Sequence, residues 1–425
     1  MKVSHLLKSN KVLLSLWCAV AAFGTYFCMY AFRKPFSTGL YENLFLWGFS
    51  YKTVLIITQV LGYMISKFVG IKIISELRQN KRIALIISLI VFAEIALILF
   101  AIVPFPYNFI FLFFNGLPLG MVWGIIFSFL EGRRITEFIV LGLCSNLVVG
   151  SGVLKTIYLS LYNSISVSEF LMPAIIGLIF LPLFLFFVLM LAQIPKPDLE
   201  DIALKSERPP MTTRQKKNLL AEYGVGLCVI FFLYMILTTI RDFRDNFSVE
   251  IWKSMGQNFD KNIFATTELT VGLFVLILLA TVGLFKDNKS AFWYIQLLIF
   301  LGIVSCGGST WLFEHHHLSA QTWMIVIGIS FFLPYLLLQT LFFERFIALF
   351  RLKANAGFFV YICDSMGYLG SMSLMIYKEF FIKNLRWIEI LTNLSYGVFG
   401  LGLLCWSIFM VYIVWKQKEN SFALS

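Results

Sequence analysis

Long runs of apolar residues are the feature that most limits how this chain folds. They divide into twelve segments of about 20 residues, joined mostly by short polar connections. A helix of about that length crosses the hydrocarbon core of a bilayer and satisfies its own backbone polar groups there. The composition agrees, because 59% of the residues are hydrophobic and only 13% are charged. The sequence therefore predicts an all-α integral membrane protein in a lipid bilayer and excludes a soluble enzyme.

The predicted spans fall into two groups of six around one long connection, residues 193–222, which contains four prolines and charges of both signs. Many secondary transporters are built from duplicated halves. We therefore expect two pseudo-symmetric six-helix bundles, residues 1–192 and 223–425, joined by a cytoplasmic linker. The spans are placed at residues 12–32, 52–71, 83–103, 109–130, 138–161, 170–192, 223–243, 263–285, 291–312, 322–343, 355–376 and 389–415.

The distribution of basic residues predicts the topology. An even number of spans puts both termini on one side of the membrane. If that side is the cytoplasm, 22 of the 34 Lys and Arg residues lie inside and 10 outside, with Lys67 and Lys155 within spans. We expect a multi-pass protein of the cell inner (plasma) membrane with cytoplasmic termini. The net charge of +11 then reflects topology, and we expect no nucleic-acid partner.

The sequence lacks the residues that several kinds of function require. No Gly-x-x-x-x-Gly-Lys-Ser/Thr segment is available to hold ATP phosphates. The four histidines, His5 and His315 to His317, lie outside the predicted spans, and three adjacent histidines do not share one helical face. A solvated loop is therefore favoured over a metal site. We expect no enzymatic activity, no catalytic residues, no metal and no cofactor, and we expect a monomer.

A repeated spacing marks the ends of spans one and seven. Tyr26 precedes Arg33 by seven residues, and Tyr234 precedes Arg241 by seven, so both pairs are offset by 208 residues. Matched positions in two halves favour an anion clamp, in which two guanidinium groups bind one oxyanion. Interfacial snorkelling, which is common for basic side chains at helix ends, is the alternative. For Arg244 we favour snorkelling.

Charged residues inside the predicted spans are further candidates, because an unpaired charge in the bilayer core costs at least about 2.5 kcal/mol. Lys67, Lys155, Glu268 and Asp364 lie in spans two, five, eight and eleven. Lys155 and Glu268 both fall in the outer half of the membrane, so we expect them to pair as a gate. Lys67 and Asp364 form a second, less well matched pair nearer the inner side. Structural salt bridges are the alternative for all four.

The sequence resembles the major facilitator superfamily and, within it, the organophosphate:phosphate antiporters. Span one contains Tyr30-Ala-Phe-Arg33-Lys34-Pro35-Phe36, which is similar to that family's Tyr-x-x-Arg-Lys-x-Phe segment, whose arginine binds the substrate phosphate. Gly62-Tyr-Met-Ile-Ser66-Lys67-Phe68 resembles its second-helix segment. The resemblance implies that Arg33, Lys34, Tyr30 and Lys67 contribute to substrate binding.

Two further observations refine this resemblance. The family's fifth helix carries a histidine at the substrate site, whereas Leu147 stands near that position here. The chain is still more similar to a bacterial group of this superfamily with no assigned function, through Leu-Glu131-Gly132-Arg133-Arg134 and the segment Arg241-Asp242-Phe243-Arg244-Asp245-Asn246-Phe247. The resemblance therefore leaves phosphate open as the exchanged ion.

These features predict a secondary transporter that moves a small organic anion, including phosphorylated metabolites, by alternating access. One alternative is a sensor with a transporter fold that binds its anion without moving it. A second is a lipid-modifying membrane enzyme, which needs a His/Asp or Ser-based group of residues that the spans lack. Flux measurements distinguish the transporter from the sensor.

Overall fold

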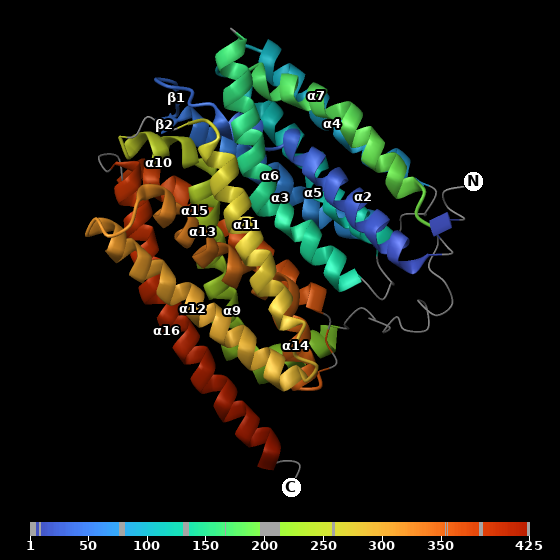
Figure 1. Cartoon of the computed structure of the whole chain (residues 1–425), viewed down its shortest axis with the longest axis vertical. Coiled ribbons are helices and arrows are strands. Elements are labelled where there is room, and N and C mark those ends of the chain that lie inside the picture. The colour runs from blue at the N-terminus through green and yellow to red at the C-terminus, as the bar shows by residue number, and fades with distance from the viewer. Residues whose placement is uncertain are drawn as a thin grey trace. The chain divides into compact units, whose positions relative to one another are not determined.

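The structure is a computed structural model that describes residues 6–7, 10–75, 81–130, 136–165, 167–195, 213–256, 260–352, 354, 356–381 and 386–422. Long helices dominate these residues (Figure 1). The first half of the chain contains α2 (Lys11–Ala31), η1 (Pro35–Thr38), β1 (Phe45–Leu46), β2 (Phe49–Ser50), α3 (Tyr51–Ser75), α4 (Arg82–Ile102), α5 (Phe109–Leu130), α6 (Thr136–Ser164) and α7 (Met172–Ala192). The two strands form one short antiparallel pair.

The second half of the chain is also built from long helices. It contains α9 (Thr213–Asn246), α10 (Ser248–Ser254), α11 (Ile263–Val282), α12 (Asn288–Glu314), α13 (Ala320–Leu337), the π-helical turn η3 (Leu338–Phe342), α14 (Phe343–Leu349), α15 (Ala356–Phe381) and α16 (Trp387–Phe422). The segment α13–η3–α14 runs on as one apolar stretch, so it corresponds to a single predicted span.

Eleven helical segments among the described residues are long and apolar enough to cross a membrane. They correspond to eleven of the twelve predicted spans. The remaining span, at residues 138–161, is helical as α6, which is not among the eleven. The prediction of an all-α, multi-pass membrane protein is therefore confirmed.

The chain divides into two compact units. The N-terminal unit comprises residues 1–206 and 259–269, and the C-terminal unit comprises residues 207–258 and 270–425. The change of unit after residue 206 falls within the predicted linker, of which residues 196–212 lie outside the described part of the chain. Two hydrogen bonds explain why the short segment joins the N-terminal unit. The Thr156 hydroxyl of α6 donates to the Lys261 carbonyl and accepts from the Ala265 amide, both at 3.1 Å.

Close backbone contact between α3 and α5 organises the N-terminal unit. A Cβ atom at Gly62 would collide with the Phe113 carbonyl, and one at Gly116 would collide with the Gln59 carbonyl. A Cβ atom at Gly120 would lie 2.6 Å from the Tyr63 carbonyl oxygen. Small residues that let helices approach in this way are typical of membrane helix pairs. This contact positions the part of α3 that carries Tyr63 and Lys67.

Replacing Gly116 by alanine should destabilise the protein, because the new methyl group meets backbone atoms that cannot move aside cheaply. We expect a cost of about 1–3 kcal/mol, the usual range for overpacking. Gly400→Ala on α16 is the matched control, since that glycine is exposed and no atom lies within 4 Å of its Cβ position. Thermal unfolding of the purified protein tests this difference. Equal melting temperatures for the two variants would contradict the packing described here.

Candidate functional site

Arg33 lies just beyond the last turn of α2, where its amide donates to the Tyr30 carbonyl at 3.0 Å. Its guanidinium carbon lies 3.9 Å from the centre of the Tyr63 ring on α3 and 5.9 Å from that of Tyr30. The negative face of an aromatic ring attracts a cation. The Tyr63 ring therefore covers one face of the guanidinium group.

A second cation approaches the same ring. Lys67 follows Tyr63 by one helical turn, and its Nζ atom lies 5.7 Å from the ring centre. Tyr26 and Tyr30 pack edge to face at 5.3 Å on α2, and both are buried. The structure thus brings together Arg33, Lys67, Tyr30 and Tyr26, four of the residues singled out in the sequence. We call these four residues and Tyr63 the N-terminal set.

Two buried amides hold the end of α2 in place. Asn115 of α5 donates to the carbonyls of Phe32, at 3.0 Å, and Ala93, at 3.1 Å. Gln59 of α3 donates to the Asn115 side-chain oxygen at 2.7 Å and to the Arg33 carbonyl at 3.0 Å. Buried polar groups that satisfy one another in this way give a rigid local structure. Contacts among α2, α3 and α5 therefore fix the backbone position from which the Arg33 side chain extends.

Lys34 contributes to the structure through its backbone carbonyl. Its carbonyl accepts a hydrogen bond from the Ser37 hydroxyl at 2.8 Å, in the turn that leads into η1. The ring contacts of the N-terminal set come from Arg33 and Lys67. A direct role of Lys34 in binding stays a prediction.

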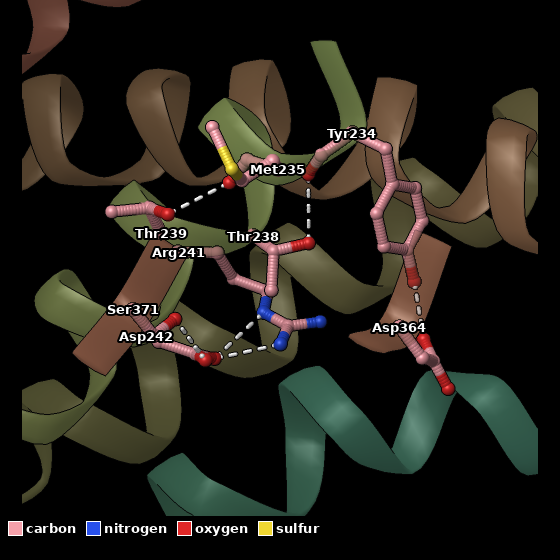
Figure 2. Close-up of polar contacts among 8 residues, drawn as sticks. All are labelled: Tyr234, Met235, Thr238, Thr239, Arg241, Asp242, Asp364 and Ser371. Atoms are coloured by element: carbon pink, nitrogen blue, oxygen red, sulfur yellow. Dashed lines mark hydrogen bonds and ion pairs between the residues drawn. The ribbon is translucent and has the colours of Figure 1, made fainter. Parts of the chain in front are cut away.

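Arg241 near the end of α9 is the counterpart of Arg33 in the C-terminal unit. Its guanidinium carbon lies 4.0 Å from the centre of the Tyr335 ring on α13. Arg241 also has a carboxylate partner. Its Nε and Nη2 atoms donate to one oxygen of Asp242 at 3.1 and 2.6 Å, and Ser371 of α15 donates to the other oxygen at 2.7 Å (Figure 2). The charge of Arg241 is therefore balanced by Asp242.

Tyr234 and Asp364 form a second polar pair in this unit. The Tyr234 hydroxyl donates to the Asp364 carboxylate at 2.7 Å (Figure 2). The Tyr234 ring packs at 5.1 Å from that of Tyr335, which covers Arg241. We call Tyr234, Arg241, Asp242, Tyr335 and Asp364 the C-terminal set. Pairing of Asp364 with Lys67 stays a prediction.

The snorkelling interpretation of Arg244 is wrong. Its side chain is buried, with only 2% of the residue exposed, and its Nη2 atom donates to the Met324 carbonyl of α13 at 3.0 Å. A Cβ atom at Gly328, one turn further along α13, would lie 3.0 Å from the same nitrogen. Arg244 is packed between helices because α13 offers a carbonyl acceptor and a glycine beside it.

Lys155 and Glu268, the predicted gate, lie on segments that touch within the N-terminal unit. Lys155 is buried, with 3% of the residue exposed. Glu268 packs against Gly152, one turn before Lys155, where a Cβ atom would lie 2.5 Å from the Glu268 Cβ atom. This packing places the two helices close together. Their role as a gate stays a prediction.

Among the described residues, no group of three or more His, Cys, Asp or Glu side chains is arranged to hold a metal ion. The histidines at 315–317 are exposed, and the Trp311 carbonyl lies 2.8 Å from the His315 Nδ1 atom. This segment therefore looks like an ordinary solvated helix end.

Sequence reasoning missed five residues in or beside the two sets: Gln59, Tyr63, Asp242, Tyr335 and Ser371. Tyr63 was visible as a neighbour of Gly62 in a family-like segment, and Asp242 as a neighbour of Arg241. The remaining three gave no signal, because they come from other helices than the arginines, Gln59 to the Arg33 carbonyl, Tyr335 to the Arg241 guanidinium group and Ser371 to the Asp242 carboxylate.

Solved structures of two transporters resemble most of the chain. The nucleoside transporter NupG matches with a TM-score of 0.62 and 14% identity, covering 94% of this chain and 98% of that chain. A D-xylose-proton symporter matches with a TM-score of 0.60 and 13% identity, covering 93% and 96%. At such low identity the likeness shows the fold alone. The chain is an all-α membrane protein with the major facilitator fold, as the sequence predicted.

The family assignment is more specific. Residues 35–416 match a protein family described as "Family of unknown function (DUF5690)". The match spans most of the chain, so the protein belongs to this family. A comparison with curated protein sequences gives no match. The finer resemblance to organophosphate:phosphate antiporters stays a prediction.

Proposed function

We propose that the protein is a secondary transporter that carries a small organic anion across the cytoplasmic membrane by alternating access. The observation that carries this proposal is the N-terminal set, in which Arg33 and Lys67 both lie over the ring of Tyr63. Two cations at one ring attract an anionic group, and a guanidinium fork binds carboxylate or phosphate through two parallel hydrogen bonds. The fold supports transport as the activity, since the two structural relatives are a nucleoside transporter and a proton symporter.

The two arginines contribute unequally in this proposal. Arg241 already donates through two nitrogens to Asp242, whereas Arg33 lies beside a second cation. Arg33 is therefore the main binding residue for the anionic group. The C-terminal set is the second substrate-binding set of this proposal, since both halves contribute to binding in many secondary transporters.

Ligand screening followed by flux measurement tests the proposal. The purified full chain is first screened by thermal shift against phosphorylated and carboxylated metabolites, because a ligand at a hundred times its Kd stabilises the folded state by about 2.7 kcal/mol. Each ligand found is then tested for uptake into proteoliposomes. Saturable uptake supports a transporter. Binding without flux favours the sensor, and stabilisation by no anion contradicts the proposal.

The topology that accompanies this function is also testable. A reporter that is active only in the cytoplasm, fused after Ser425, should be active, because 22 of the 34 basic residues lie on the predicted inner side. The same reporter inserted after His316, between α12 and α13, should be inactive. The opposite result in both fusions would show that the protein has the reverse orientation in the membrane.

A further inference from the structure

A carboxyl group near the middle of α4 is buried in the N-terminal unit without a hydrogen-bond partner. Glu94 is only 4% exposed, and neither of its side-chain oxygens has a hydrogen-bond partner among the described residues. The helix that carries it is long and apolar enough to cross a membrane. An ionised carboxyl group is costly in such surroundings, and the cost falls greatly when the group takes up a proton. A neutral acid therefore fits this position and an ionised one does not.

The helices around Glu94 supply no charge to compensate it. α4 packs against α5 and α7, and neither of these helices contains an Asp, Glu, Lys, Arg, His, Cys or Tyr residue. The other charged residue of α4 is Arg82, which lies about 18 Å away along the helix axis. Arg33 and Lys34 lie beyond the end of α2, and neither donates a hydrogen bond to Glu94. Within the described part of the chain, an ionised Glu94 thus has no partner.

The fold makes room for this acid at a glycine. A Cβ atom at Gly177 of α7 would collide with the Glu94 Oε2 atom and would lie 2.9 Å from Cδ. The same position lies 3.1 Å from the Phe32 ring. A methionine would fill this space without burying a carboxyl group, so the acid adds no stability in this conformation. A second conformation, in which Glu94 meets water and ionises, gives the acid a use.

One side chain links this acid to the anion-binding residue Arg33. The Asn115 amide of α5 donates to the Ala93 carbonyl at 3.1 Å and to the Phe32 carbonyl at 3.0 Å. These two residues directly precede Glu94 and Arg33. An ionised Glu94 places a negative charge behind the backbone from which Arg33 extends. That charge attracts the guanidinium group and repels an anionic substrate, so the neutral acid favours anion binding.

We propose that Glu94 is a proton-binding site and that a proton and the organic anion bind together, so that the protein is a proton–anion symporter. This inference rests on the proposed function, in which Arg33 binds the anion, and it adds the coupling ion. Loss of the proton leaves a carboxylate that weakens the anion site, and the anion is released. Affinity for the anion is therefore present at low pH and is lost as the pH rises through the titration of Glu94.

Infrared spectroscopy of the purified full chain tests the proton site without a ligand. At about pH 6, where exposed carboxyl groups are ionised, the wild type should show the C=O stretching band of a protonated carboxyl group. Glu94→Gln should lose this band. Glu94→Asp should keep it at a shifted frequency, which assigns the band even if the glutamine variant fails to fold. Glu314→Gln, at an exposed acid of α12, is the matched control and should leave the band unchanged. A band that is absent from the wild type, or unchanged by both Glu94 substitutions, would overturn the inference.

The pH dependence of gluconate binding tests the coupling, because the carboxylate of this probe stays ionised above about pH 5. The affinity of the wild type should fall at least about tenfold between about pH 6 and about pH 8.5, as expected when binding requires one proton. Glu94→Gln stays neutral, so it should bind gluconate equally at both pH values and about as tightly as the wild type does at the lower one. Glu314→Gln should behave as the wild type. Wild-type protein that binds no gluconate or binds it equally at both pH values, or a pH dependence that Glu94→Gln retains, would overturn the coupling.

The outcomes separate this inference from the proposed function. If Arg33→Lys weakens gluconate binding while Glu94→Gln keeps the pH dependence of the wild type, the anion site stands and the role of Glu94 fails. If the carboxyl band behaves as expected but Arg33→Lys leaves gluconate binding unchanged, the proton site stands and the proposed function fails.

Discussion

Arg33→Lys should weaken binding of the anionic substrate between about tenfold and about a hundredfold, the equivalent of about 1.5–3 kcal/mol for a charged hydrogen bond. Lysine keeps the positive charge but loses the planar pair of donors, and its ammonium group does not stack on Tyr63 as a guanidinium group does. The fold should survive, because the amides of Gln59 and Asn115 hold the backbone at this point rather than the Arg33 side chain.

Arg386→Lys is the matched control for this variant. The Arg386 side chain is 71% exposed and pairs with Glu389 at the start of α16, outside both sets. Its replacement should leave binding unchanged. Isothermal titration of the purified variants measures both effects. If Arg33→Lys binds as tightly as Arg386→Lys, then Arg33 is only an anchor at the membrane interface.

Neutralising either Lys155 or Glu268 should reduce the transport rate by about tenfold or more. We hypothesise that the two side chains form a latch that closes the outer side and opens in each transport cycle. Removing one partner leaves the other charge buried without compensation, which is more costly than losing the pair. Packing of Glu268 against Gly152, one turn before Lys155, motivates the hypothesis.

A charge-swap experiment tests the latch. Lys155→Met and Glu268→Gln should each impair uptake, and Lys155→Glu combined with Glu268→Lys should recover part of it, because the pair is restored in reverse. Lys261→Met is the control, since this residue is exposed and its hydrogen bond to α6 comes from the backbone carbonyl, which the substitution keeps. A double variant as inactive as the worse single variant would reject the latch.

The positions of the helices were predictable because about 20 consecutive apolar residues have few alternatives to crossing a bilayer. The ends of the helices were less predictable. α9 begins at Thr213, ten residues before the predicted span, and α16 continues to Phe422, seven residues beyond its predicted span. Helices continue into water when their polar residues form helix well, and hydropathy does not report this.

The cations of the candidate site were predictable for a different reason. A charge within or beside an apolar span is conspicuous, so Arg33, Lys67 and Arg241 stood out in the sequence. Their aromatic partners did not, because 17% of the residues are aromatic and Tyr63 and Tyr335 resemble many others. The contact between Tyr335 and Arg241 depends on helices that are about 95 residues apart in sequence.

The role of Asp242 was hidden by its closeness to Arg241. Adjacent residues on a helix ordinarily face different directions, so their spacing did not indicate that they pair. The long arginine side chain nevertheless reaches its neighbour's carboxylate, and Ser371 from α15 holds that carboxylate in place. The two arginines therefore differ in their surroundings, since Arg33 stacks on Tyr63 and Arg241 also pairs with Asp242. The anion clamp itself stays a prediction.

Uptake of the anion selected by thermal shift, measured in proteoliposomes that contain the wild type or Arg33→Lys, tests the central claim most directly. The account predicts saturable uptake by the wild type that is at least about tenfold slower in the variant at a substrate concentration below the wild-type Kd. Binding by the wild type without any uptake, or equal uptake by the two proteins, would contradict it.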